Sequence, residues 1–359
     1  MKTDVDEILK KAQEDTASLT DDELALLLDL TVEDERQKLF CAARHVREKY
    51  FGGKIFLYGF VYFSTYCRNS CTFCYYRRNN AQSPRYRKTP EEILRAAMAL
   101  KASGVHLLDL TMGEDPYYLS SGEEGYARLI RLVREIHEQV QLPVMISPGV
   151  VPENVLERLR MAGADWYACY QETHTRSLYE KLRLDQSYDE RWSRKLYAKQ
   201  CGFQIEEGLL VGIGETLQDI VHSLREMQKL DAGQVRTMTF VPQSGTPLGG
   251  RKSQGDHREI NLIAVMRLLF AEKLLPASLD IEGVQGLKER LAAGANVVTS
   301  LIPSTAGLAG VAQADLEIAD GCRSTSGVLP VLESCGLSAA TVQEYRHWLA
   351  RNRRMEGIV

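Results

Sequence analysis

The sequence predicts an α/β fold, a (βα)8 TIM barrel with an N-terminal helical extension and a C-terminal helix. The chain has 359 residues, which suits a barrel of about 250 residues with added segments. Between residue 54 and about residue 310, short apolar runs alternate with helical segments, a pattern typical of a parallel sheet covered by helices. A doubly wound open sheet is the alternative, because sequence does not show whether the sheet closes.

Residues 1–53 are predicted to be a helical extension packed on the barrel. Thr20 and Glu23 have the spacing of a capping box, in which each side chain bonds the backbone of the other. Apolar residues recur at helical spacing between residues 32 and 50. The glycine pair that follows, Gly52 and Gly53, is a usual helix stop.

The barrel itself is predicted over residues 54–310. Period-2 and apolar patterns predict its strands, which cover residues 55–63, 105–111, 143–147, 166–171, 204–211, 235–241, 277–281 and 296–301. The helices between them are predicted over residues 89–103, 123–139, 152–161, 175–200, 215–230, 256–273 and 283–293. Residues 311–359 form a C-terminal extension with one amphipathic helix at about residues 338–351.

Composition excludes several partner classes. With 44 Lys and Arg against 48 Asp and Glu, the net charge is −4, so neither nucleic acid nor an anionic membrane is expected as a partner. The first sixteen residues lack an apolar segment typical of a secretion signal, and no run of eighteen apolar residues predicts a membrane span. Eight cysteines in a chain of this length are not a disulfide scaffold. We therefore expect a cytoplasmic protein.

Three cysteines carry the strongest chemical motif of the chain. Cys67, Cys71 and Cys74 have the spacing C-x3-C-x2-C and follow the first predicted strand. Three thiolates can hold three irons of a 4Fe-4S cluster and leave the fourth iron open to a small molecule. A structural zinc site is the alternative, but it usually needs a second pair of Cys or His ligands, which the sequence lacks.

The second predicted strand brings a carboxylate to the same end of the barrel, where barrel enzymes place their chemistry. Side chains alternate along a strand, so Asp109 and Thr111 share one face while His106 takes the other. If Asp109 points inward, His106 points toward the helices and is a structural histidine. Asp109 can also be read as a loop cap.

Two further strands add polar groups. Arg236 lies in an apolar strand and needs an anionic partner if it is buried, either a substrate or a structural ion pair. Ser278 and Asp280 lie two residues apart and therefore share a face. Together with Asp109, these groups complement a small diamino acid, with the carboxylates on its ammonium groups and Arg236 on its carboxylate.

A glycine-containing segment, residues 208–216, follows the fifth predicted strand. By itself it is weak evidence, because a turn into a helix has the same composition. After a barrel strand, however, glycines let the backbone approach a flat adenine ring. Glu172 and Arg183, after the fourth strand, can hold an amino group, a ribose or a carboxylate, or pair with each other on the surface.

Together these motifs resemble those of the radical S-adenosylmethionine superfamily, in its biotin synthase-like branch. The cysteine spacing followed by aromatic residues is the most specific match, and residues 112–115 resemble the Gly-Gly-Glu stretch, with Met112 in place of the first glycine. The resemblance implies a 4Fe-4S cluster on the three cysteines and S-adenosyl-L-methionine as cofactor. It also implies S-adenosylmethionine contacts from Phe73, Tyr75, Met112, Glu114, Ser147, Glu172, Arg183, Gly212 and Gly214.

Longer blocks, residues 62–67, 109–118, 145–149, 236–240 and 276–280, are similar to the 3-methylornithine synthase family of pyrrolysine biosynthesis. This resemblance implies a radical mutase that converts L-lysine to (3R)-3-methyl-D-ornithine through a 5′-deoxyadenosyl radical. It implies that the amino acid is held by Asp109, Arg236, Ser278 and Asp280. The electron donor is expected to be a flavodoxin or ferredoxin.

Two alternatives remain at this level. One is another enzyme of the same branch, a hydrogenase maturase or a sulfur-inserting enzyme with a second cluster. Strand alternation places Cys169 on the face opposite Tyr170 and Glu172, which is a poor position for a second cluster. The other alternative is a non-catalytic iron–sulfur or zinc-binding protein.

Overall fold

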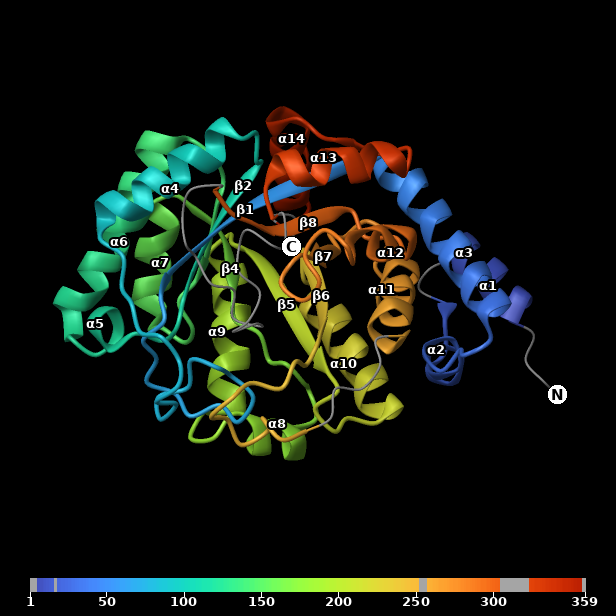
Figure 1. Ribbon diagram of the computed structural model, residues 1–359, viewed down its shortest axis with the longest axis horizontal. Coiled ribbons are helices and arrows are strands. Elements are labelled where there is room, and N and C mark those ends of the chain that lie inside the picture. Colours follow the sequence, from blue (N-terminus) through green and yellow to red (C-terminus); the bar gives the residue numbers. More distant parts are fainter. Residues whose placement is uncertain (1–4, 16–17, 252–256, 304–322, 357–359) are drawn as a thin grey trace.

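The computed structural model describes residues 5–15, 18–251, 257–303 and 323–356, and its centre is a nearly closed parallel barrel (Figure 1). Its strands are β1 (Lys54–Ser64), β2 (Leu107–Met112), β3 (Val144–Ser147), β4 (Ala164–Ala168), β5 (Gln204–Val211), β6 (Gln234–Thr239), β7 (Pro276–Ser278) and β8 (Val297–Leu301). They are hydrogen-bonded in the order β6-β5-β4-β3-β2-β1-β8-β7. An isolated parallel bridge joins Gln234 to Leu274, and Val235 N donates to Leu274 O at 3.0 Å. This bridge links β6, at one end of the strand order, to the residues just before β7, at the other end. The predicted barrel is therefore confirmed, and the alternative of an open sheet is wrong.

Helices surround the barrel and cover its outer face (Figure 1). They are α4 (Pro90–Ala102), α5 (Pro116–Leu119), α6 (Gly122–Val140), α7 (Glu153–Met161), α8 (Arg176–Leu182), α9 (Tyr188–Gln200), α10 (Leu217–Leu230), α11 (His257–Leu269) and α12 (Leu287–Ala292). The predicted capping box of α4 is present, because Thr89 Oγ1 accepts from Glu92 N and Glu92 accepts from Thr89 N. None of the helices among the described residues is long and apolar enough to cross a bilayer.

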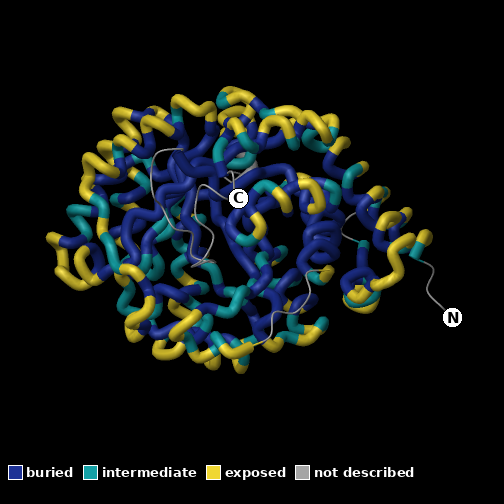
Figure 2. The backbone as a smooth tube through the Cα atoms, viewed as in Figure 1, coloured by how far each residue is buried: buried dark blue, intermediate teal, exposed yellow. Residues whose placement is uncertain are grey.

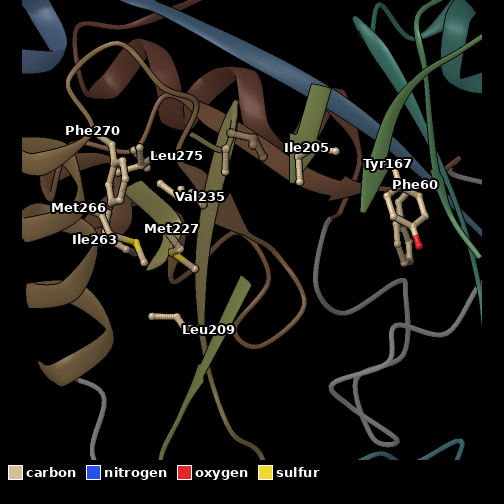
Figure 3. Packing of buried hydrophobic residues seen from close by; sticks show 14 of the residues in the cluster. Phe60, Tyr167, Ile205, Leu209, Met227, Val235, Ile263, Met266, Phe270 and Leu275 are labelled. Atoms are coloured by element: carbon tan, nitrogen blue, oxygen red, sulfur yellow. The ribbon is translucent and has the colours of Figure 1, made fainter. Parts of the chain in front are cut away.

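Apolar side chains fill the layer between the strands and the helices. Figure 3 shows Leu209 and Val235 of β5 and β6 near Met227 of α10 and Phe270, which follows α11, with Ile205 of β5 farther from them. All of them are at most 5% exposed. The exposed residues lie mainly on the outer surface (Figure 2). This packing fixes the strands and therefore the positions of the groups at their ends.

The N-terminal extension comprises α1 (Val5–Glu14), α2 (Asp21–Leu28) and α3 (Glu33–Phe51). It packs on the barrel through α11, and Asn261 of α11 donates to the carbonyl oxygens of Leu28 and Leu30. The capping box predicted at the start of α2 is present.

The C-terminal residues cover the amino-terminal end of the barrel, opposite the carboxyl ends of the strands. They form α13 (Thr325–Ser334), β9 (Ser338–Ala339), which pairs with the start of β1, and α14 (Val342–Glu356). The hydroxyl of Tyr345 in α14 forms a hydrogen bond of 2.9 Å with that of Tyr58, and the ring of Trp348 stacks on that of Trp166 with 5.8 Å between the ring centres. The residues they contact are inward-facing side chains of β1 and β4, so α14 covers the amino-terminal opening.

Several predicted boundaries are wrong. The strand predicted to reach residue 171 ends at Ala168, and the strand predicted over 277–281 ends at Ser278, because loops carry the chain onward to the cavity. α13 and β9 were not predicted, and α14 begins at Val342 rather than at residue 338. The helix predicted over 283–293 is shorter, Leu287–Ala292, and the one predicted over 256–273 is His257–Leu269. The boundary predicted at residues 310 and 311 lies outside the described residues.

Candidate active site

A cavity of about 260 Å³ extends from the cysteine loop into the barrel at the carboxyl ends of the strands. Most of the predicted site residues contribute to its wall, namely Cys67, Cys71, Phe73, Cys74, Asp109, Met112, Glu114, Ser147, Glu172, Arg183, Arg236 and Asp280. The other four predicted residues lie outside this wall: Tyr75, Gly212, Gly214 and Ser278. The cysteines lie at one end of the cavity and Asp109, Arg236 and Asp280 at the other.

Arg85 fixes the cysteine loop that follows β1. Its guanidinium donates to the carbonyl oxygens of Thr65 at 2.5 Å, Tyr76 at 2.9 Å and Arg77 at 2.6 Å. The guanidinium of the partly buried Arg85 therefore joins the two ends of the loop, on either side of the cysteines. The loop is also attached to the far side of the cavity, because Thr72 N donates to Leu182 O at 2.8 Å.

The three clustered thiols are free, and polar donors surround them. Gln186 Nε2 lies 3.1 Å and Arg183 Nη1 lies 3.6 Å from Cys71 Sγ, and Asn69 N lies 3.5 Å from Cys67 Sγ. Burial raises the pKa of Cys67 to about 11. Such thiols ionise when a metal binds them, and donors of this kind stabilise the resulting thiolates.

The ligand geometry fits a cluster better than a single ion. Within residues 5–15, 18–251, 257–303 and 323–356, no three His, Cys, Asp or Glu side chains converge to hold one metal ion. In a 4Fe-4S cluster each thiolate binds a different iron, so its ligands need not converge on one point. Three thiols in one cavity wall, with donors beside them, are a suitable ligand set for such a cluster.

Glu114 lies between two arginines next to the cysteine loop. Its carboxylate accepts from Arg68 Nε and from Arg191 Nη2, both at 3.0 Å, and from Val150 N at 3.3 Å. Burial raises the pKa of Glu114, but the charges of Arg191 and Arg68 outweigh it, so the pKa is below its ordinary value. Gly149 makes room for this carboxylate, because a Cβ there would lie 2.2 Å from Glu114 Cγ.

Glu172 and Arg183 form a buried ion pair rather than the surface pair considered from sequence. Arg183 Nη2 donates to Glu172 Oε1 at 2.7 Å, and the arginine lies 5.5 Å from the ring centre of Phe73. Burial raises the pKa of Glu172, although the charge of Arg183 opposes this. The pair thus connects the cavity wall to the cysteine loop.

The glycine loop after β5 is held by its own carboxylate. Glu215 accepts from the backbone N–H groups of Gly212 at 2.8 Å, Ile213 at 2.9 Å and Gly214 at 3.0 Å. Both glycines have positive φ, +90° and +108°, which few side chains permit. These N–H groups already donate to Glu215, so they are not available to bind an anion. A ligand beside the loop could contact only its surface and its carbonyl groups.

Asp109 faces the barrel interior, as strand alternation predicts. Its only hydrogen bond among the described residues comes from Thr111 Oγ1 at 2.7 Å. Burial and the negative charge of Glu206 raise the pKa of Asp109 to about 7. On the opposite face, His106 Nδ1 accepts from Leu57 N at 2.9 Å, so the prediction that His106 is structural is confirmed.

Arg236 has both an internal partner and free donors. Its Nε donates to Glu206 Oε1 at 2.9 Å, while Nη2 is buried and has no hydrogen-bond partner within the described part of the chain. The structural ion pair considered from sequence therefore exists, but it uses only one side of the guanidinium. The outer side remains available within the cavity wall.

Asp280 accepts hydrogen bonds from three side chains of the protein. Its carboxylate accepts from Ser278 at 3.1 Å, from Ser300 at 2.7 Å and from Arg323 Nη2 at 2.6 Å. Ser278 thus reaches the site through Asp280 rather than through the cavity wall. Arg323 enters from the segment before α13, far along the chain from β7.

Sequence reasoning missed four residues of the site: Cys169, Arg191, Glu206 and Arg323. Cys169 was expected on the opposite face from Tyr170 and Glu172, and this is wrong. β4 ends at Ala168, so strand alternation no longer applies and all three residues contribute to the cavity wall. Two consecutive carboxylates in an apolar strand could have indicated Glu206, whereas no local pattern marks Arg323.

Comparison with known proteins assigns the chain to a family. The model of the Radical SAM superfamily matches residues 61–227. The 3-methylornithine synthase of Methanosarcina acetivorans is 45% identical over 327 residues, which cover 91% of this chain and 92% of that protein. The chain belongs to the 3-methylornithine synthase family. A crystal structure of methylornithine synthase has a TM-score of 0.90 and 43% identity, over 95% of this chain and 99% of that one.

More distant relatives of this family share the barrel. The FeFe-hydrogenase maturase subunit HydE of Thermotoga maritima is 31% identical over 295 residues, 81% of this chain and 82% of that protein. The structure of the hydrogenase maturase HydG from Carboxydothermus hydrogenoformans has a TM-score of 0.80 at 22% identity, which shows the shared fold. The chain is a radical S-adenosylmethionine enzyme, and the prediction of a 4Fe-4S cluster and S-adenosylmethionine as its cofactors is confirmed.

Proposed function

We propose that this enzyme converts L-lysine to (3R)-3-methyl-D-ornithine, an intramolecular isomerisation that is the first step of pyrrolysine biosynthesis. The supporting observation is that one cavity is lined both by the three cysteines and by the charged groups Asp109, Arg236 and Asp280. The names of the family members fit this activity.

The charges of the inner half of the cavity suit lysine. Its wall contains two carboxylates, Asp109 and Asp280, and the guanidinium group of Arg236. Glu206 and Arg323 are not wall residues, but they form ion pairs with Arg236 and Asp280. With all five ionised the net charge is −1. Lysine at neutral pH carries two ammonium groups and one carboxylate, a net charge of +1. A dicarboxylic amino acid would add to the negative charge and is disfavoured.

The individual groups suggest how lysine is held. Arg236 has free donors for the α-carboxylate, and Asp109 has no cationic partner within ion-pair distance among the described residues. A buried carboxylate of this kind is stabilised by a substrate ammonium group. Ser278 and Asp280 bound the same region, and we assign them to the remaining ammonium group.

Cofactor binding is assigned to the outer half of the cavity. Cys67, Cys71 and Cys74 hold the cluster, and the S-adenosylmethionine contacts are assigned to the wall residues Phe73, Met112, Glu114, Ser147, Glu172 and Arg183. Tyr75, Gly212 and Gly214 are assigned to the same cofactor on the resemblance alone, because they lie outside the wall. When bound, these cofactors supply the 5′-deoxyadenosyl radical that takes a hydrogen atom from the substrate. The chain positions lysine, and its buried wall keeps water away from reactive fragments.

We further propose that an acidic flavodoxin or ferredoxin reduces the cluster by docking on the cysteine loop. Residues 66–90 contain six basic residues and no acidic one, although the whole chain has a net charge of −4. Arg77 and Arg78 contact Ser70 rather than a carboxylate. Replacing both with Glu is expected to slow reduction by flavodoxin but not by dithionite, which needs no docking surface.

A cytoplasmic location and the absence of nucleic-acid and membrane partners belong to the same proposal. The described cysteines are free thiols, as a reducing compartment requires. For the domain organisation, we propose a helical extension over residues 1–53, the radical S-adenosylmethionine barrel over 54–310 and a C-terminal extension over 311–359.

The decisive experiment supplies uniformly 13C-labelled lysine to the reduced holoenzyme with S-adenosylmethionine, separates the products by chromatography and identifies them by their fragmentation in tandem mass spectrometry. We expect labelled 3-methylornithine, an isomer with the mass of lysine but a different retention time and fragmentation, and none from the Cys71→Ala variant. Recovery of unaltered lysine together with released 5′-deoxyadenosine would contradict lysine as the substrate. It would then favour another activity of the branch, such as that of a hydrogenase maturase or a sulfur-inserting enzyme.

A further inference from the structure

Arg236 presents only one edge of its guanidinium to the cavity. The residue is 6% exposed. Nε donates to Glu206 Oε1 at 2.9 Å, Nη1 lies 3.9 Å from Met238 Sδ, and Nη2 has no hydrogen-bond partner among the residues that the structure describes. A buried N–H group without an acceptor is destabilising, because it has lost its hydrogen bonds to water and gained none in return. The unsatisfied edge therefore indicates that an acceptor is supplied by a ligand.

The carboxylate of Glu206 accepts hydrogen bonds from three side chains of the protein. Oε1 accepts from Arg236 Nε and from Gln234 Nε2 at 2.6 Å, and Oε2 accepts from the Tyr170 hydroxyl at 2.6 Å. Glu206 is completely buried. Because three donors already surround the carboxylate, it acts on Arg236 rather than on a substrate ammonium group.

Tyr170 completes the support of Arg236. Its ring centre lies 5.8 Å from the central guanidinium carbon, while its hydroxyl bonds Glu206. The ring and the carboxylate therefore fix the guanidinium from two directions. A guanidinium held in one orientation can donate to both oxygens of a carboxylate in a single geometry.

We propose that Glu206, with Tyr170 and Gln234, is the positioning group that aims the outer edge of Arg236 at the α-carboxylate of the amino-acid substrate. This inference rests on the proposed function, in that the ligand is lysine. Glutamine at position 206 keeps the size of the side chain but removes its charge. It weakens the attachment of Nε, so the guanidinium can turn away from the cavity.

The test compares two ligands that differ only in the carboxylate. Binding of lysine and of 1,5-diaminopentane is measured by anaerobic calorimetry on unreduced holoenzyme with S-adenosylmethionine. Glu206→Gln is expected to weaken lysine binding by about 10- to 100-fold and to leave diaminopentane binding unchanged. A merely structural role would weaken both ligands together.

Two further variants serve as controls. Glu207→Gln changes the adjacent carboxylate, which contacts Lys195 on the outer face of β5. It is expected to lower the melting temperature and keep the preference for lysine over diaminopentane. If Glu206→Gln does not fold, Tyr170→Phe removes one donor from Glu206, and lysine binding should weaken by about threefold or more with diaminopentane binding unchanged.

Unchanged lysine affinity in Glu206→Gln, or in Tyr170→Phe where that variant replaces it, would overturn the inference. An equal loss of both ligands would also overturn it, since the role of Glu206 would then be merely structural. If the wild-type enzyme itself did not bind lysine, the proposed function would fail first and this inference with it. These outcomes are distinguishable because the wild-type titration is read separately from the variants.

Discussion

Arg323 Nη2 donates to Asp280 Oδ1 at 2.6 Å, and both residues are buried. One of the two carboxylates predicted to hold substrate ammonium groups is thus already neutralised by a residue about forty positions later in the chain. Asp109 has no such partner among the described residues. The two aspartates are therefore unequal, and Asp109 is the stronger site for a cation.

Asp109→Asn is expected to change the pH dependence of stability. The pKa of Asp109 is raised from its ordinary 3.8 to about 7 in the folded protein. The folded state therefore binds a proton that the unfolded state has lost, so the free energy of unfolding falls as pH rises between about 4 and 7. Asn removes this loss and should stabilise the protein at pH 8 by up to about 4 kcal/mol, measured by urea denaturation at pH 5 and pH 8.

A matched control is Asp231→Asn, for which the pH dependence of stability has the opposite sign. Burial raises the pKa of Asp231, but hydrogen bonds from Lys199 and Lys273 outweigh it and lower the pKa. The stability that Asp231 contributes is present above its unfolded pKa and is lost as pH falls. A pH-independent difference between wild type and Asp109→Asn would contradict the assignment of a raised pKa to Asp109.

Arg323→Ala is expected to destabilise the fold strongly. It leaves Asp280 buried without its cation, a change that typically costs about 3–5 kcal/mol. Denaturant unfolding measures the cost. Arg351→Ala is the control, because its 3.9 Å pair with Glu272 is more than half exposed on both sides, and such a pair contributes about 0–1 kcal/mol. A similar small effect for both variants would show that the Asp280 pair is unimportant for folding.

Gly149→Ala is expected to weaken binding of S-adenosylmethionine. Gly149 has φ +79°, and a Cβ there would lie 2.2 Å from Glu114 Cγ, so the carboxylate must move. Equilibrium binding should show a loss of about tenfold. Gly104→Ala is the control, because φ is +90° and the added Cβ meets no atom within 4 Å. Equal affinities in both variants would argue against a role of Glu114 in cofactor binding.

Cys71→Ala is expected to abolish cluster assembly while the barrel remains folded. Cys71 receives hydrogen bonds from Gln186 and Arg183, and two cysteines cannot hold three irons. Iron analysis of anaerobically reconstituted protein should give about four irons in wild type and almost none in the variant. Cys201→Ala, outside the cavity wall, should keep the full content. About eight irons in wild type would instead indicate a second cluster.

Local patterns were sufficient for much of the fold. The capping boxes at Thr20 and Thr89 depend on residues three positions apart, and both are present. Alternation along β2 correctly placed Asp109 in the cavity wall, because the period of two is a property of the strand itself. His106 lies one residue before β2 and is structural, as predicted. The same rule was wrong for Cys169, since β4 ends one residue earlier.

The sequence by itself therefore determined the alternation of strands and helices, the cysteine motif and the type of charge in the cavity. Each of these is encoded within a few neighbouring residues. Only the tertiary structure decided which charges are neutralised: Glu206 pairs with Arg236 and Asp280 with Arg323. Such pairs join residues 30 and 43 positions apart, and their partners are set by barrel closure and by the path of the C-terminal segment. The pairing, not the composition, leaves Asp109 without a cationic partner and the outer edge of Arg236 without an acceptor among the described residues.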